Sequence, residues 1–418
     1  MDSLKNAGRY VLTMALLCVA MAGSAHAQGG ASTPGIEIEG ESGPSLEMYG
    51  FIMADAIYDF QRMDPDWDDA FRPSKIPTDE GQFGGDGQAS VSVKQSRFGI
   101  KGSMPTGEGN TPLTFKFDFD LFGTGDNAGQ TTFRLQNAYA EWGSLLAGQT
   151  DSVFMDIDVF PNTIDYWGPP GMVFYRNVQI RWTPYRTDNS HFAIAIERPG
   201  NDIDGGNVRL IEGFEDAEIQ NDEELPDLTA QWRLNGDWGH FQASGILRRV
   251  GFEARATPDE PFRDGHETGW GINLGSAIST FGDDMLRLQV VYGEGIASYM
   301  NDGGMDLAPQ LVSPEPDVRV AAEVVPLTGV VAYYDHYWSD SWSSSIGYSY
   351  TEVDNTNFQD PGAFHRGDYA SVNLLTYPGE NLMMGVELMW GEREDNNDAT
   401  GDDTRIQFSV KYSFAKPL

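Results

Sequence analysis

Apolar and polar residues alternate along many short runs of this chain. In LTFKFDFDLF, residues 113–122, leucine and phenylalanine occupy the odd positions, whereas Lys116, Asp118 and Asp120 occupy even ones. Successive side chains of a β-strand point to opposite faces of the sheet. The run therefore predicts a strand with one apolar, aromatic face and one charged face.

The same alternation recurs from Leu46 towards the C-terminus and predicts about sixteen strands. The predicted strands are 46–60, 90–102, 112–122, 131–142, 144–149, 177–184, 191–198, 227–234, 238–248, 267–278, 284–293, 329–338, 341–352, 367–377, 382–392 and 404–414. The segment 316–326 is either a seventeenth strand or part of a loop that folds back.

The connections between these strands are of two kinds, tight and long. NGD at 235–237 and PGE at 378–380 are tight turns. The long connections are acidic and span 61–89, 150–176, 199–226, 249–266, 294–328, 353–366 and 393–403. Short turns on one rim and long loops on the other are typical of outer-membrane barrels, whereas a soluble β-sandwich would bury its aromatic rows. We therefore predict an all-β fold, a transmembrane antiparallel β-barrel of about 16 strands, over residues 45–418.

The N-terminal residues predict export. A charged start and an apolar run that ends in AHA at 25–27 have the pattern of a signal peptide over residues 1–27. Residues 28–44 are small and polar, which predicts a flexible periplasmic leader. The one cysteine, Cys18, falls within the predicted signal peptide, so the mature chain is expected to have no disulfide.

Charge excludes one class of partner. The net charge of −36 argues against nucleic-acid binding, which needs a basic surface.

After the signal peptide, no stretch of the sequence reaches the roughly 18 uninterrupted apolar residues of a membrane helix. If the protein meets a membrane, it is expected to cross it as strands, with its localisation in the bacterial outer membrane.

Several segments resemble a known family. RLQNAYAEWGSLLAGQTDSVFMDIDVFPNTIDYWGPPG (134–171), followed by RNVQIRWTP (176–184), is similar to the strand–loop–strand core of DcaP-type porins. MYGFIMADAIYDF (48–60) resembles their first strand, and residues 333–350 resemble a later strand–turn–strand unit. These porins are trimeric outer-membrane channels of Gram-negative bacteria associated with dicarboxylate uptake. The resemblance implies a homotrimer that contacts outer-membrane lipid and lipopolysaccharide and passes small organic acids.

The resemblance also implies a role for residues 150–176, which lie between the fifth and sixth predicted strands. In general porins the third extracellular loop folds into the barrel and narrows it. The acidic candidates for such a constriction are Asp151, Asp156, Asp158 and Asp165. Alternatively, these acids are solvated or hydrogen-bonded within the loop.

Basic residues on the polar faces of the strands are candidates for the pore wall. A charge on the lipid face near mid-membrane costs about 2–4 kcal/mol, so these side chains should point into water. A guanidinium can bind both oxygens of a carboxylate. The candidate pore-lining and substrate-binding residues are Arg97, Lys116, Arg134, Arg176 and Arg181, with Arg233 and Arg287 on later strands. Each of these cations could instead serve only to pair with an inward acid.

The predicted function is passive diffusion of small hydrophilic solutes, with a preference for dicarboxylates or other small organic anions. Most acids lie in the connections, and a Debye length of about 8 Å limits how far their field reaches into a pore. A non-selective or cation-preferring pore remains an alternative. An outer-membrane barrel enzyme is a second one, although no zinc-spaced histidines and no G-x-S-x-G motif occur, and neither a metal site nor a cofactor is predicted.

Overall fold

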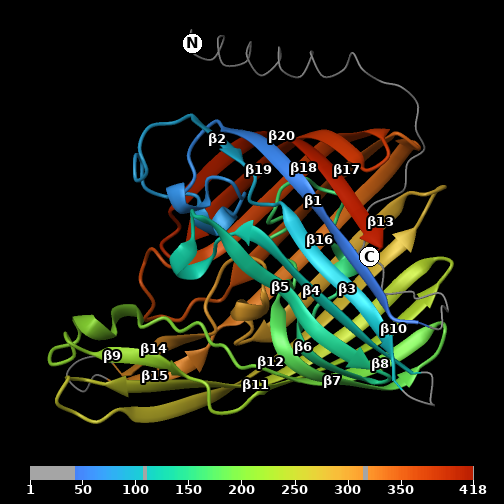
Figure 1. Ribbon diagram of the computed structural model, residues 1–418. Helices are drawn as coiled ribbons and strands as arrows, with labels where there is room; N and C mark the ends of the chain where they lie inside the picture. Colours follow the sequence, from blue (N-terminus) through green and yellow to red (C-terminus); the bar gives the residue numbers. More distant parts are fainter. Residues whose placement is uncertain (1–42, 107–110, 314–318, 418) are drawn as a thin grey trace, which may run out of the picture.

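The computed structural model describes residues 43–106, 111–313 and 319–417. The predicted signal peptide, 1–27, and nearly all of the predicted leader, 28–44, lie outside the described residues. One large antiparallel sheet curves round and closes on itself (Figure 1). Within the described ranges, no helix is long and apolar enough to cross a membrane.

The elements of the described residues are strands and short 3-10 helices. The strands of the large sheet are β1 (Ser45–Asp59), β2 (Gln88–Ser92), β3 (Arg97–Pro105), β4 (Pro112–Phe122), β5 (Thr131–Trp142), β6 (Leu145–Asp151), β7 (Arg176–Arg186), β8 (Ser190–Glu197), β9 (Glu218–Asp222), β10 (Asp227–Gly236), β11 (Gly239–Arg255), β12 (Arg263–Ser279), β13 (Met285–Glu294), β16 (Pro326–Ser339), β17 (Trp342–Val353), β18 (Phe364–Gly379), β19 (Leu382–Asp395) and β20 (Thr400–Pro417). A second, two-stranded sheet consists of β14 (Leu307–Ser313) and β15 (Arg319–Val324). The 3-10 helices are η1 (Pro65–Trp67), η2 (Pro73–Lys75), η4 (Gly125–Asn127), η5 (Ile157–Val159), η6 (Gly206–Leu210) and η7 (Ala297–Tyr299).

The large sheet is a closed barrel of sixteen strand positions. β2 and β3 pair with successive parts of β1, and β9 and β10 pair with successive parts of β11. Each of these two pairs therefore fills one position. β1 and β20 pair in antiparallel fashion from Glu47 opposite Pro417 to Asp59 opposite Arg405, which closes the ring. The predicted 16-strand antiparallel barrel is confirmed.

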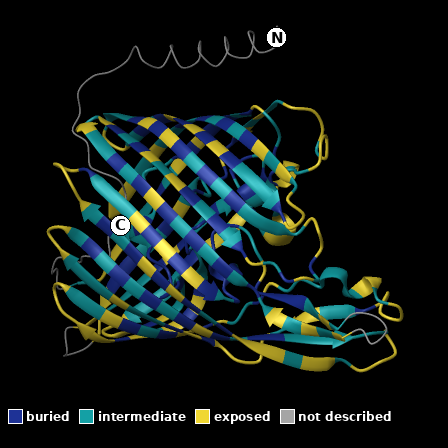
Figure 2. Cartoon of the chain, turned by 180° about the vertical axis from the view of Figure 1, so that it is seen from behind, coloured by how far each residue is buried: buried dark blue, intermediate teal, exposed yellow. Residues whose placement is uncertain are grey.

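Along the strands, residues that face the barrel interior alternate with residues that face outwards, as the sequence predicted. On β4, Phe117 is 45% exposed, whereas Asp118 and Asp120 are fully buried. Figure 2 shows the same alternation of exposed and buried residues around the barrel wall. The exposed residues form an apolar outer surface. The opposite face of each strand is polar and points to the interior of the barrel. We call this second face the polar face.

Several segments differ from the sequence-based prediction. The predicted strand 90–102 is interrupted between β2 and β3, where Lys94 turns away to form an ion pair with Asp69 (Nζ–Oδ2 2.8 Å). The predictions of loops over all of 249–266 and 393–403 were wrong, since β11, β12, β19 and β20 extend into them. The predicted loops 199–226 and 294–328 likewise contain strands, β9 and β14. Alternation is lost there because both faces of a strand meet water beyond the lipid. Of segment 316–326, residues 319–324 form β15, which pairs with β14 outside the barrel wall, and Pro326 begins β16.

The two ends of the barrel differ. Tight turns join β10 to β11, β16 to β17 and β18 to β19 at the short-turn end, and the long loops lie at the long-loop end. Beyond the long-loop end a protrusion continues the barrel wall outwards, formed by residues 206–226 and 249–266 together with β14 and β15 (Figure 1, lower left). It carries 12 of the 63 acidic residues of the chain.

The loops at the long-loop end share a buried apolar core with the barrel wall. Phe71 comes from the loop after β1, Phe154 and Met172 from the loop after β6, and Tyr299 from the loop after β13. They belong to one buried cluster that also includes Tyr369 of β18. The loops are therefore packed against the wall as part of the folded structure.

Two glycines allow the loop after β6 to approach the wall closely. A Cβ added at Gly275 of β12 would lie 2.4 Å from the Asp156 carboxylate, and one added at Gly171 would lie 2.1 Å from the Tyr350 carbonyl oxygen. Real Cβ atoms do not come this close to other heavy atoms. A larger residue would force the backbone apart at Gly171 and would displace at least the Asp156 side chain at Gly275.

Candidate pore-lining site

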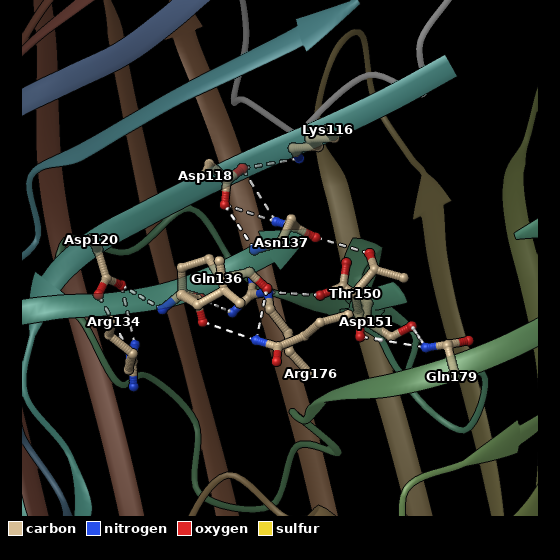
Figure 3. Close-up of polar contacts among 12 residues, drawn as sticks. Lys116, Asp118, Asp120, Arg134, Gln136, Asn137, Thr150, Asp151, Arg176 and Gln179 are labelled. Carbon is tan, nitrogen blue, oxygen red and sulfur yellow. Dashed lines mark hydrogen bonds and ion pairs between the residues drawn. The ribbon is translucent and has the colours of Figure 1, made fainter. Parts of the chain in front are cut away.

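The predicted basic residues of strands β3 to β7 lie on neighbouring strands, and we call Arg97, Lys116, Arg134, Arg176 and Arg181 the basic cluster. Lys116 lies 3.5 Å from Asp118 (Nζ–Oδ2) on the polar face of β4 (Figure 3). The Tyr49 hydroxyl donates to the same carboxylate at 2.6 Å, and the Asn137 amide donates to it at 3.0 Å. Lys116 is therefore partly neutralised within the wall.

Arg134 and Arg176 are also paired. Arg134 forms an ion pair with Asp120 at 3.1 Å, and Tyr166 of segment 152–175 contacts both side chains. Arg176 donates to the Gln136 side chain at 2.6 Å and lies 2.9 Å from Asp151 (Nε–Oδ1) (Figure 3). These two cations thus fasten the start and the middle of the loop after β6 to β4 and β5.

Arg97 and Arg181 lack a close carboxylate partner. Arg181 donates to the Gln179 side chain at 2.9 Å and to the Asp151 carbonyl at 2.6 Å, neither of which is charged. Among the described residues, nothing forms a hydrogen bond or ion pair with the Arg97 side chain, and its Nε atom is buried without a partner. Arg97 is opposite Asp120 in the β3–β4 register, but the two charges are not in contact.

The predicted loop acids have three kinds of environment. Asp156 is fully buried and contacts His240 at 2.8 Å and Arg233 at 3.3 Å. Asp158 contacts Arg233 at 2.5 Å with its side chain 30% exposed, and the side chain of Asp151 is 31% exposed beside Arg176. Asp165 is buried and accepts hydrogen bonds from the backbone N–H groups of Phe71, Trp167 and Gly168.

Segment 152–175 contacts the polar face of many strands. The Met155 and Phe154 carbonyls accept from Gln242 and Asn273, and the Ile164 N–H donates to Glu387 at 2.6 Å. Arg287 forms an ion pair with Asp335 at 2.5 Å and also donates to the Asp158 carbonyl. Through these contacts residues 154–164 lie along strands β11, β12, β13 and β19.

The sequence analysis missed the packing of the first long loop. The Arg72 guanidinium carbon lies 4.1 Å from the ring centre of Trp67 and 4.4 Å from that of Trp167. Arg72 also donates to Asp302 at 2.7 Å. This contact joins the loops after β1, β6 and β13. Paired aromatic residues in both loops were the available signal, but their partner could not be read from the sequence.

A cavity of about 980 Å³ lies among the loops at the long-loop end. Its lining includes Arg72, Lys75, Asp202, Asp302 and Arg393. Burial, together with the neighbouring Arg72 cation, lowers the pKa of the Lys75 ammonium. Both signs of charge are therefore present around this outer cavity.

Comparison with known protein families agrees with the barrel architecture. The profile of the DcaP outer membrane protein family matches residues 38–414. The chain belongs to this family. Family and barrel together identify an outer-membrane channel of the porin kind, and they point to a channel rather than to an enzyme.

Solved structures show the same fold at low sequence identity. The outer membrane channel DcaP of Acinetobacter baumannii is 20% identical, with a TM-score of 0.71 over 90% of this chain and 99% of that one. An anion-selective porin from Comamonas acidovorans is 8% identical, with a TM-score of 0.58 over 89% and 100% of the two chains. The trimer form of OmpT of Vibrio cholerae is 11% identical, with a TM-score of 0.52 over 89% and 100%. Among proteins with curated descriptions, none shows significant similarity to this chain.

Proposed function

We propose that this protein is a homotrimeric outer-membrane porin that favours small organic anions, dicarboxylates among them. In this proposal segment 152–175 runs across the interior and narrows the pore. The basic cluster faces it from β3 to β7 and makes the local field positive. The long-loop end is then extracellular, in contact with lipopolysaccharide, and the short-turn end is periplasmic.

The observation that carries the proposal is the separation of charges around segment 152–175. The loop acids Asp156 and Asp158 are paired with Arg233, and Asp156 also contacts His240. They are thus compensated by the strands behind them. Arg97 and Arg181 have no carboxylate in contact. Fixed cations beside a narrow aqueous path stabilise a partly dehydrated anion without holding it tightly.

Reversal potentials in a salt gradient test the proposal. We expect the wild-type channel in a planar bilayer to prefer anions, and we expect Arg97→Met, Lys116→Met and Arg181→Met combined to abolish or reverse that preference. Lys416→Met, at the exposed end of β20, removes a charge outside the proposed constriction and serves as the matched control.

Two results would contradict the proposal. A cation preference that the triple variant leaves unchanged would favour a pore governed by the net charge of −36. An absence of stepwise conductance would contradict a porin altogether. Conductance that changes in groups of three equal steps is the expected mark of the trimer.

A further inference from the structure

Lys75, at the long-loop end, faces a cavity without an anionic partner. It is the last residue of η2 and lines the outer cavity of about 980 Å³. The residue is half-buried. Within the described ranges, neither a hydrogen bond nor an ion pair reaches its ammonium group. Because a buried charge needs a polar partner, this ammonium depends on the water or solute in the cavity.

Two further cations, Arg72 and Arg393, lie near Lys75 and line the same cavity. Burial lowers the pKa of the Lys75 ammonium, and the two arginine charges lower it further. Asp302 and Asp64 act in the opposite direction. Charges shift a pKa in this way when they are close by, so the three cations form one group beside η2.

The arginines of this group are already bound to acids. One Asp302 oxygen accepts from Arg72 at 2.7 Å and from the Ser74 hydroxyl at 2.5 Å, and the other accepts from the Ser74 N–H at 2.9 Å. Asp395 forms an ion pair with Arg393 at 2.6 Å. Two carboxylates thus compensate two of the three cations, and the third has none in contact.

The other acids of the cavity lining are bound or lie elsewhere. Asp204 accepts from a backbone N–H at 2.7 Å and from a glutamine amide at 2.9 Å. Asp360 accepts from a backbone N–H at 2.8 Å. The charges that act on Asp202 are those of Asp306 and Arg248, and none belongs to the group beside η2. The cavity therefore has a basic corner, and its free acid is on another side.

Arg72 offers a second donor in this corner. Its Nε and one terminal nitrogen bind Asp302 at 2.9 and 2.7 Å, and its other terminal nitrogen has no hydrogen bond within the described part of the chain. The rings of Trp67 and Trp167 hold the guanidinium in place. Trp167 belongs to segment 152–175, so the basic corner lies against that segment.

We propose that Lys75 and the free terminal nitrogen of Arg72 bind one carboxylate group of a small organic acid, on the long-loop side of segment 152–175. This inference deepens the proposed anion preference and rests on it for its physiological meaning. One carboxylate oxygen would replace cavity water at the ammonium, and the other can accept from the guanidinium. The site would hold an organic anion before it meets the basic cluster.

Binding of succinate to the full barrel in detergent micelles tests the site. Methylation of the lysines with 13C-formaldehyde keeps their charge, and the Lys75 signal is assigned by its loss in Lys75→Met. We expect succinate to shift this NMR signal in a saturable manner and to raise the pKa of the methylated amine, because a bound anion favours its charged form. Succinamide, a neutral compound of similar size, should not shift it.

Block of ion current in a planar bilayer measures the same site in the membrane. Lys75→Met should weaken block by succinate added on the long-loop side about fivefold, whereas Lys75→Arg should preserve it because the cation remains. Arg198→Met is the matched control, since Arg198 is an exposed cation just after β8, at the same end, and does not line this cavity.

These results are independent of the ion selectivity of the whole channel. A Lys75 signal that succinate leaves in place would overturn the site even if the pore prefers anions. Equal loss of block in Lys75→Met and Arg198→Met would overturn it as well, because the effect would then come from the general charge of the loops. A saturable shift would support the site even if the pore prefers cations.

Discussion

At the scale of single residues, acids of one loop have different roles although their sequence context is alike. Asp165 holds three backbone N–H groups, Asp156 is buried against Arg233 and His240, and Asp158 is partly exposed. Only a partly exposed acid can act on a passing solute directly. The role of each acid therefore depends on its partners, which the alternation of residue types does not contain.

Asp165→Asn should loosen the contact between the first long loop and segment 152–175. An amide offers one acceptor oxygen where the carboxylate offers two, and its NH2 group would face either the N–H of Phe71 or the N–H groups of Trp167 and Gly168. We expect a cost of about 1–3 kcal/mol, seen as larger and noisier single-channel conductance. Asp126→Asn, at an exposed position of η4, is the control. Conductance equal to wild type in both variants would show that this carboxylate does not fix the loops.

The stability of the loop after β8 should depend on pH because of Asp202. Burial raises the pKa of its carboxyl group, and Asp306 adds to the shift, while Arg248 opposes it. A raised pKa in the folded state means that ionised Asp202 destabilises the loop at neutral pH, and that this penalty disappears as the pH falls below its ordinary value of 3.8. Asp202→Asn should therefore slow amide hydrogen exchange in residues 199–217 at pH 7 and have no effect near pH 3. Equal exchange at pH 7 would contradict the cause given for the shift.

At the scale of elements, period-two alternation was sufficient to predict the strands that lipid covers on one side. It failed where that constraint ends. The outer parts of β11 and β12 have water on both faces, and the break between β2 and β3 depends on Lys94 reaching Asp69. The packing of segment 152–175 against glycines of the wall depends on tertiary contacts alone.

Gly275→Ala tests how closely the loop and the wall fit. The new methyl group would overlap the Asp156 carboxylate, so the loop or β12 must shift. We expect a loss of about 1–3 kcal/mol, measured as a lower thermal unfolding midpoint, and a changed single-channel conductance. Gly245→Ala, where the nearest heavy atom is 3.7 Å away, should leave both unchanged. If both variants behave alike, the loop is not held against β12 at this point.

The same limit applies to the site. Parity of the alternation put Arg97, Lys116 and Arg181 on the polar face of their strands, in agreement with their burial. Which cation is paired and which is free depends on residues far away in sequence, such as Tyr49 beside Asp118.

At the scale of the whole molecule, the charge is unevenly distributed. The net charge is −36, and 12 of the 63 acidic residues lie in the protrusion, which extends beyond the long-loop end of the barrel (Figure 1). Because physiological salt screens charges beyond about 8 Å, the protrusion should affect the membrane surface more than the pore.

Neutralising the protrusion should therefore leave ion selectivity unchanged. Glu212, Glu215, Asp216 and Glu223 are exposed, and their replacement by Gln or Asn removes four charges without burying a polar group. We expect the reversal potential at about 0.15 M salt to stay at the wild-type value and to shift only at about 0.01 M, where the Debye length reaches about 30 Å. A large shift at 0.15 M would assign selectivity to the protrusion instead of the wall.

The joint between β1 and β20 has a consequence for assembly. The Ile164 carbonyl accepts from Gln95, which precedes β3, and from Gln407 of β20, so the loop touches both sides of β1. Arg405 and Asp59, paired across the joint, are 346 residues apart in sequence. A slip of one residue between β1 and β20 would turn Gln407 towards lipid and leave this carbonyl with one donor fewer. The two hydrogen bonds of the Ile164 carbonyl thus form together only in the native register of β1 and β20.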